Sequence, residues 1–236
     1  MQSDVTHLAL QDQLLTWFEK NKRQVLWGAV AVALIGCAAG IYLWKQNEVQ
    51  ADASEALSKI TSGNLTSGAQ PGTPEALLKV TTDYPGTDAG RRALLLAAGN
   101  YFAEGKYKEA QAQFERFLRD YRDSAFATEA LFGVAKCKDA QGMTNEALAA
   151  YKDIVDHHPS EGVTPQARFA LARVYEAQNK LELARDLYQQ VAQTDPNGQL
   201  GLEAGMQLAE LFSKYPGLIP ARATSAIPPG LNPGKP

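Results

Sequence analysis

Residues 105–124 read GKYKEAQAQFERFLRDYRDS, and this stretch decides the fold because the chain repeats its pattern twice. The later copies are GMTNEALAAYKDIVDHHPSE at 142–161 and NKLELARDLYQQVAQTDPNG at 179–198, which gives a period of 37 residues. Self-similarity at a fixed period of roughly 20–50 residues is typical of solenoids, in which each unit buries its apolar face against the next unit. The sequence therefore predicts a stacked array of similar units.

The three copies agree at the positions that decide how helices pack. Each copy has a small residue, an aromatic ring four positions later, and another apolar side chain three positions after the ring. These residues are Ala110, Ala147 and Ala184; Phe114, Tyr151 and Tyr188; and Phe117, Ile154 and Val191. Side chains with this spacing lie on one face of an α-helix. We expect the alanines to allow close helix crossings and the larger side chains to fill the space beside them.

Each copy also begins at a turn and follows a second apolar segment. The turns contain Gly105, Gly142 and Asn179, residue types that tolerate the left-handed backbone at helix ends. The segments before the turns are LLLAAGNYF (94–102), LFGVAKCKD (131–139) and FALARVYEA (169–177). Each unit is therefore predicted to be a helix–turn–helix pair, and the fold class is predicted to be an all-α helical solenoid.

The composition of the chain divides it into further segments. The repeat domain, with about three units and a capping helix, is expected at residues 91–214. Residues 45–90 are expected to form a helical linker and a short helix that leads into the repeats. Residues 215–236 carry six prolines, which lack an amide donor and oppose helix, so this tail is expected to be disordered.

A stretch near the N-terminus has the length and composition of a membrane span. Residues 25–44 read VLWGAVAVALIGCAAGIYLW and contain no charge. A helix of this length, at about 1.5 Å per residue, crosses a hydrocarbon core of about 30 Å. Trp27 lies near one end of the stretch, and Tyr42 and Trp44 lie near the other, where aromatic rings favour the membrane interface. The sequence therefore predicts one transmembrane helix.

The charges around this stretch predict its orientation. Before it come Lys20, Lys22 and Arg23, and after Lys45 come Glu48, Asp52 and Glu55. Positive charge is enriched on the cytoplasmic side of membrane helices. Residues 1–24, in which leucines recur at helical spacing, are therefore expected to be a cytoplasmic amphipathic segment. In a bacterium this orientation corresponds to an expected localisation in the inner membrane, with a single pass and the repeat domain in the periplasm.

Two other interpretations of the apolar stretch stay open. A cleavable signal peptide has a similar position, although its apolar region is usually shorter, about 7–15 residues. The residues Leu34-Ile35-Gly36-Cys37 match the short pattern that precedes a lipid-modified cysteine in bacterial lipoproteins, although the residues after Cys37 are apolar rather than polar. An uncleaved anchor is favoured over both.

The sequence shows no constellation that indicates catalysis, a metal or a cofactor. It contains no GxxxxGK[ST], GxSxG or HExxH motif, and its two cysteines, Cys37 and Cys137, lack zinc spacing. The pair His157-His158 precedes Pro159 at a predicted helix end, where a cationic histidine is favoured by the helix dipole. The net charge of −3 gives no electrostatic reason to expect nucleic acid as a partner.

The repeated pattern resembles the tetratricopeptide repeat, in which a small residue and an aromatic ring recur in the second helix and proline closes the unit. The period of 37 exceeds the usual 34 of that family, Arg122 stands where proline is usual, and Leu94 and Arg168 stand where tryptophan is usual. The longer units are similar to those of the bacterial Tol–Pal coordinator and BamD families. The layout of one span before the repeats resembles the YfgM-type family.

The resemblance to tetratricopeptide arrays implies a groove lined by the first helix of each unit. Carried over to this sequence, the groove residues are Arg92, Leu95, Phe102, Glu129, Phe132, Lys136, Asp139, Phe169, Arg173 and Glu176. Phe132 and Phe169 hold equivalent positions, with charges of both signs around them, a combination that suits a peptide or a partner helix. The alternative is that these two rings are core and the charges are only solvated.

The sequence is therefore interpreted as a protein-binding scaffold or chaperone-like adaptor in the bacterial envelope, not an enzyme. The YfgM-type resemblance implies association with the SecYEG translocon, with translocon subunits, periplasmic chaperones or exported chains as partners. The alternative is a lipid-anchored outer-membrane assembly factor resembling BamD, with Cys37 as its mature N-terminus. An enzyme with an unrecognised site is a third hypothesis.

Overall fold

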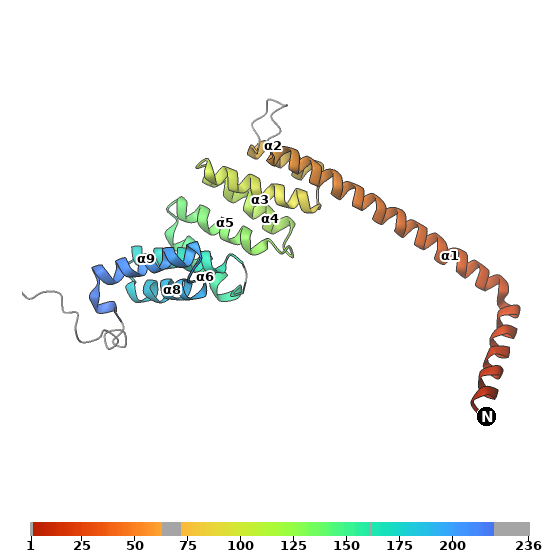
Figure 1. Ribbon diagram of the computed structural model, residues 1–236. Coiled ribbons are helices and arrows are strands. Elements are labelled where there is room, and N and C mark those ends of the chain that lie inside the picture. Colours follow the sequence, from red (N-terminus) through yellow and green to blue (C-terminus); the bar gives the residue numbers. More distant parts are fainter. Residues whose placement is uncertain (1, 63–71, 161, 220–236) are drawn as a thin grey trace, which may run out of the picture. The chain divides into compact units, whose positions relative to one another are not determined.

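The computed structural model describes residues 2–62, 72–160 and 162–219 of the chain (Figure 1). It forms two compact units, an N-terminal unit of residues 1–56 and a repeat unit of residues 57–236. Every regular element in the described ranges is a helix, which confirms the all-α fold class with a tetratricopeptide-like solenoid.

The N-terminal unit consists of one helix, α1, which runs as Gln2–Thr61 and continues into the repeat unit. The segment Lys20–Thr61 is long and apolar enough to cross a membrane, by length and composition. Its large apolar side chains, among them Trp27, Ile35 and Trp44, are exposed in the structure. The side chains of residues 1–19 lie outside the described residues, and so does the amphipathic face expected there.

The repeat unit contains eight further α-helices among its described residues. They are α2 (Pro74–Asp83), α3 (Asp88–Ala103), α4 (Tyr107–Asp120), α5 (Ala127–Ala140), α6 (Thr144–His157), α7 (Thr164–Ala177), α8 (Leu181–Thr194) and α9 (Gln199–Lys214). From α2 to α9 each helix packs against the next one in the chain, which is the arrangement of a solenoid. The pairs α3–α4, α5–α6 and α7–α8 are the three repeated units.

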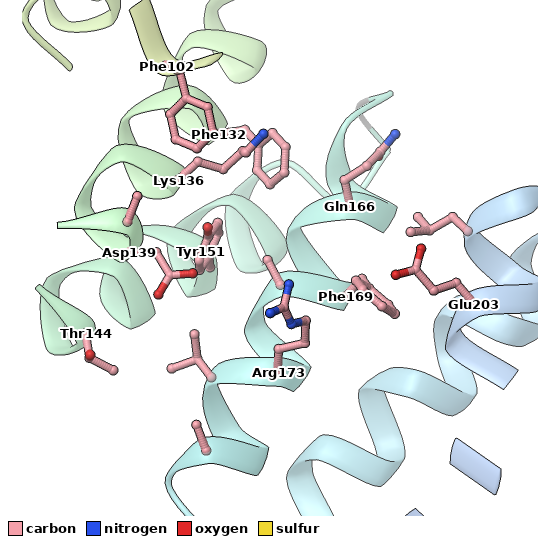
Figure 2. Close-up of a pocket in the computed structure, with 15 residues that line it drawn as sticks. Phe102, Phe132, Lys136, Asp139, Thr144, Tyr151, Gln166, Phe169, Arg173 and Glu203 are labelled. Carbon is pink, nitrogen blue, oxygen red and sulfur yellow. The ribbon is translucent and has the colours of Figure 1, made fainter. Parts of the chain in front are cut away.

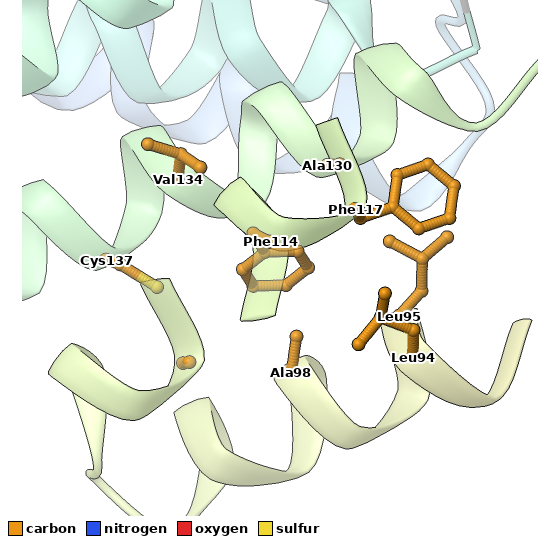
Figure 3. Packing of buried hydrophobic residues seen from close by; sticks show 9 residues of the cluster. Leu94, Leu95, Ala98, Phe114, Phe117, Ala130, Val134 and Cys137 are labelled. Carbon is orange, nitrogen blue, oxygen red and sulfur yellow. The ribbon is translucent and has the colours of Figure 1, made fainter. Parts of the chain in front are cut away.

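The repeated positions form the core. The alanines at 110, 147 and 184 are fully buried, and so are the aromatic and apolar residues that follow them, of which Phe114 is the least covered. Phe114 and Phe117 belong to one buried cluster with residues of α3 and α5, including Leu94 and Val134 (Figure 3). The alanine therefore brings the helices close together, and the ring fills the space beside the crossing.

The turns between paired helices use the left-handed backbone that their residue types favour. Gly105 has φ 76°, Gly142 has φ 75° and Asn179 has φ 57°. At each turn an amide one residue beyond donates to a carbonyl in the last turn of the helix; for example, Lys106 N lies 2.9 Å from Tyr101 O. This bond satisfies a carbonyl that the helix end would leave without a partner.

The C-terminal end of the repeat unit extends beyond the expected capping helix. After α9, residues Pro216–Leu218 form a short 3-10 turn, η1, that packs on α8 and α9. Leu218 is buried, and its carbonyl accepts a hydrogen bond from Arg185 Nη1 at 3.3 Å. The disordered tail was expected from residue 215, whereas the described structure continues to 219; residues 220–236 lie outside it.

Candidate functional site

An open groove of about 600 Å³ lies in the repeat unit. The first helices of the units, α5 and α7, supply most of its lining, and α3, α6 and α9 close its sides. The side chains that define it are Phe102, Phe132, Lys136, Asp139, Thr144, Tyr151, Gln166, Phe169, Arg173, Leu200 and Glu203 (Figure 2). The groove combines aromatic rings with charges of both signs.

Six of the ten residues carried over from the family pattern line this groove. They are Phe102, Phe132, Lys136, Asp139, Phe169 and Arg173. The period explains why they meet, since Phe132 and Phe169 are 37 residues apart, as are Lys136 and Arg173 and also Phe102 and Asp139. Equivalent positions on stacked helices lie side by side in a solenoid.

The structure puts the other four expected residues elsewhere. Leu95 is buried in the cluster around Phe114. Arg92 and Glu129 are exposed in the first turns of their helices, with the Arg92 guanidinium 5.7 Å from the Phe126 ring centre. Glu176 lies in an adjoining cavity of about 360 Å³, which it shares with Arg173 and Lys214.

Phe132 and Phe169 both take part in core packing and also line the groove. The Phe169 ring is only 8% exposed and packs edge-on against Tyr188, at 5.5 Å between ring centres. The Phe132 ring is half-buried and lies 5.9 Å from the Tyr151 ring. Each ring therefore packs against the second helix of its own unit and also lines the groove. Removing Phe169 affects the core more than removing Phe132.

Lys136 lies over two of the groove's aromatic rings. Its ammonium is 4.5 Å from the centre of Phe102 and 5.8 Å from the centre of Phe132 (Figure 2). An ammonium over a ring face is attracted by the ring quadrupole, by about 0.5–1 kcal/mol when exposed. The contact joins two neighbouring units and holds a positive charge at the groove.

The sequence analysis did not name several groove residues. Gln166 and Glu203 line the groove and stand 37 residues apart, in the same register as Glu129. Applying the register of Glu129 to α7 and to the capping helix would have found both. Thr144 and Tyr151 come from α6, a second helix, which the family pattern does not assign to the groove.

The buried tyrosine hydroxyls near the groove stay neutral. Burial raises the pKa of Tyr151 well above its usual range, and nearby Asp139 raises it further. Burial also raises the pKa of Tyr188, whose hydroxyl donates a hydrogen bond to Glu176 at 2.9 Å. A neutral tyrosine can donate a hydrogen bond and can pack as an apolar ring. Tyr151 lines the groove and gives it aromatic surface and a neutral hydroxyl, whereas the Tyr188 hydroxyl is already bonded to Glu176.

The histidines expected at a helix end lie there. His157 is in the last turn of α6, and its Nδ1 lies 2.8 Å from Asp153 Oδ1. His158 follows the helix, with its Nδ1 3.3 Å from Thr128 Oγ1 of α5. Among the residues whose placement is described, no group of three or more His, Cys, Asp or Glu side chains could hold a metal ion.

Solved structures with a similar fold include tetratricopeptide repeat proteins. A tetratricopeptide repeat protein from Parabacteroides merdae matches with a TM-score of 0.51 and 15% identity, over 72% of this chain and 62% of that chain. A variant of the putative kinesin light chain repeats from Podosopora anserina matches with a TM-score of 0.50 and 15% identity, over 74% of this chain and 89% of that chain. At these identities the likeness shows the fold alone.

A third similar structure is PcrH from Pseudomonas aeruginosa in complex with the chaperone binding region of PopD. It has a TM-score of 0.45 and 19% identity, over 52% of this chain and 91% of that chain. No curated protein matches the chain significantly.

Two family models match the sequence itself. The model described as a tetratricopeptide repeat-like domain matches residues 16–150, more than half of the chain. A second model, described as a tetratricopeptide repeat, matches residues 138–198. This fold is typically a non-catalytic scaffold for protein interaction. The chain therefore belongs to the tetratricopeptide repeat-like domain family and is a protein-binding scaffold of that type.

Proposed function

We propose that the chain is a membrane-anchored adaptor whose groove holds a segment of another protein in the bacterial envelope. The observation that carries this proposal is the groove itself. Three phenylalanines, Phe102, Phe132 and Phe169, line it together with two cations, Lys136 and Arg173. Aromatic anchors within a polar rim are the usual centre of a protein-binding surface.

The mixed charges of the groove favour a particular kind of segment. Asp139 and Glu203 line the groove beside the two cations, so both signs are present. A bound segment that carries an apolar anchor and charges of both signs would be oriented by them. Charge pairs at the rim of an interface set orientation and association rate more than affinity.

The exposed apolar helix supports the membrane part of the proposal. Within Lys20–Thr61 the large apolar side chains of the most apolar stretch, among them Trp27, Ile35 and Trp44, are exposed. Exposed apolar surface of this extent is typical of a segment that lies in lipid or in another protein. We propose that this helix anchors the chain in the inner membrane, with the repeats in the periplasm and the translocon or its chaperones as partners.

Site-specific photo-crosslinking in the full-length membrane protein tests the proposal. A photoreactive residue at Gln166, exposed and lining the groove, is compared with one at Gln190, exposed on α8 and not among the groove residues. Adducts with translocon subunits or periplasmic chaperones from position 166, and none from 190, are expected. Equal labelling from both positions would place the binding surface outside the groove.

A double variant then connects the adducts to the aromatic anchors. Phe102→Ala with Phe132→Ala removes two half-buried groove rings and leaves the more deeply buried Phe169 in place. Hot-spot aromatic residues contribute about 2 kcal/mol or more, equivalent to about thirtyfold in affinity. We expect the adducts to disappear while the helical circular dichroism is unchanged. Retention of every adduct in a folded double variant would contradict the groove assignment.

A further inference from the structure

The last helix, α9, is the first half of a fourth unit by its register. Ala204 stands 37 residues after Ala167 and 74 after Ala130, and all three are fully buried. Glu203 and Leu200 line the groove from α9, as Gln166 does from α7. The solenoid therefore continues through α9 in the same packing arrangement.

One face of α9 departs from that arrangement. Ala98, Ala135 and Ala172, at equivalent positions in α3, α5 and α7, are fully buried, whereas Ala209 of α9 is exposed. Met206, equivalent to Phe169, is 65% exposed, where Phe169 is only 8% exposed. Leu202, one turn before Met206, is 56% exposed. Spacing of i, i+4 and i+7 places these three residues on one side of the helix.

The earlier units show what normally covers this side. Phe132 packs against Tyr151 of α6, and Phe169 packs against Tyr188 of α8. In each case the covering helix is the second helix of the same unit. It presents an alanine and, four residues later, an aromatic ring, as in Ala184 and Tyr188.

The described residues after α9 do not provide such a helix. Between residues 215 and 219 the only regular element is η1, which packs against the ends of α8 and α9. Further on, the sequence has Ser225 where Tyr188 stands one period earlier, and Pro228 where Val191 stands. The sequence therefore keeps the alanine of the second-helix pattern, as Ala221, but lacks its aromatic ring and the apolar residue that follows the ring.

We propose that Leu202, Met206 and Ala209 form a docking face for an amphipathic helix of a partner protein, one that presents a small residue and an aromatic ring four residues later. That helix completes the fourth unit, because it occupies the place that α6 and α8 occupy in theirs. The interface would repeat the α7–α8 interface already present in the chain, since Met206 is equivalent to Phe169, which packs against Tyr188 of α8. Binding of an amphipathic helix by its apolar side is a common recognition mode. This face is separate from the groove proposed above.

A peptide from the chain itself is the matched probe. Residues 180–195, KLELARDLYQQVAQTD, carry the second-helix pattern with Ala184 and Tyr188. The fluorescein-labelled peptide is titrated with the full-length protein in detergent, and binding is followed by anisotropy. Saturable binding is expected, with a dissociation constant on the order of micromolar. The same peptide with Tyr188→Ser is expected to bind at least about tenfold more weakly.

Variants of the full-length protein test whether the peptide binds to the proposed face of α9. Met206→Glu should weaken peptide binding by about tenfold or more, because it places a charge against the aromatic ring of the peptide. The control is Leu183→Glu, a substitution of an apolar residue that is 48% exposed on α8 and not part of this face. Circular dichroism confirms that both variants fold. The control should bind like the parent protein.

Other outcomes overturn the inference. Binding that survives Met206→Glu means that the peptide docks elsewhere, and loss of binding in the Phe102→Ala, Phe132→Ala variant means that it docks in the groove. Absence of binding at about 100 µM peptide would show that the proposed face does not bind a helix with this pattern. A dimer in light scattering that Met206→Glu dissociates would assign the face to a second copy of the chain. None of these results depends on whether the groove binds its own partner.

Discussion

Gly133 of α5 lies against the ring of Phe114 of α4. A β-carbon built at Gly133 would lie 2.5 Å from Phe114 Cζ, closer than carbon atoms approach in folded proteins. Phe114 is almost fully buried in the cluster between α3 and α5, so its ring has little room to move. The first two units therefore pack in a way that depends on the absence of a side chain at position 133.

Gly133→Ala should lower the free energy of unfolding by about 1–3 kcal/mol, because the added methyl overpacks the interface. Urea unfolding followed by circular dichroism measures the change. Gly99→Ala in α3 is the matched control, since a β-carbon there meets nothing within 4 Å. Alanine is favoured over glycine within a helix, so the control should be neutral or stabilising. A parent-like midpoint for Gly133→Ala would mean that the two helices are farther apart than the structure has them.

Ala147→Leu should also destabilise the repeat unit, by roughly 1–3 kcal/mol. Ala147 is fully buried at the crossing of α6 with its neighbours, so the added atoms must displace packed side chains. Ala149, exposed on the same helix, gives the control Ala149→Leu. Thermal unfolding of the three proteins should separate the buried variant from the parent and the control. Equal melting temperatures would contradict the repeat register.

Lys136→Glu should weaken capture of the groove's partner most at low salt. The substitution replaces the ammonium above Phe102 and Phe132 with a carboxylate beside Asp139, so the groove loses its cation–π contact and gains negative charge. Contributions of exposed charges are screened as ionic strength rises, and rim charges act mainly on association rate. Association rates of the variant and the parent, measured at about 20 mM and 500 mM salt, should converge at the higher concentration. A deficit that is independent of salt would argue for a packing role instead.

The Cys137 thiol should react slowly in the folded protein. Burial raises its pKa to about 11. The thiolate is the reactive form, and a shift of about two units leaves on the order of a hundredfold less of it at neutral pH. Ellman's reagent at about pH 8, near the ordinary pKa of a free thiol, measures the rate in a Cys37→Ser background before and after urea is added. Immediate reaction in the absence of urea would show that Cys137 is exposed.

The raised pKa of the Cys137 thiol also predicts that the stability of the repeat unit depends on pH. Because burial disfavours the thiolate, the unfolded chain loses this proton at lower pH than the folded protein does. The contribution of Cys137 is therefore fully present below about pH 9 and is lost as the pH rises towards about 11. The free energy of unfolding should fall less over this window in Cys137→Ala than in the parent. The buried hydroxyl of Tyr188, whose pKa is also raised, contributes to both proteins, whereas burial is the first and the Cys137 thiolate the last of the causes that raise the pKa of Tyr151, so the thiolate's part is absent from the variant.

The full chain should stay in the membrane pellet after alkaline carbonate washing, if the exposed apolar helix is its anchor. Cys37→Ser provides the discriminating variant, because Cys37 lies within the apolar stretch and is exposed. An uncleaved span predicts that the variant has the parent's size and location. Altered processing of the variant would favour the lipoprotein alternative, and release of the parent into the supernatant would contradict a spanning helix.

The sequence by itself determined the repeat architecture. A period of 37 residues, with buried-type residues such as Ala147 and Tyr151 at helical spacing, leaves few ways to bury the apolar faces except by stacking. Gly105 and Asn179 likewise mark the turns, because few residue types adopt the left-handed backbone found there. These features are local or periodic, so the order of residues is enough to predict them.

Only the tertiary structure decided which equivalent positions form a surface. Leu95 and Phe132 occupy the same register, yet Leu95 is buried in the core and Phe132 reaches the groove, because the ring is longer and different neighbours surround it. Met206, in the same register again, is exposed, because no second helix follows α9 among the described residues. Burial is a property of the neighbours that the fold brings to a residue, and the period alone does not specify them.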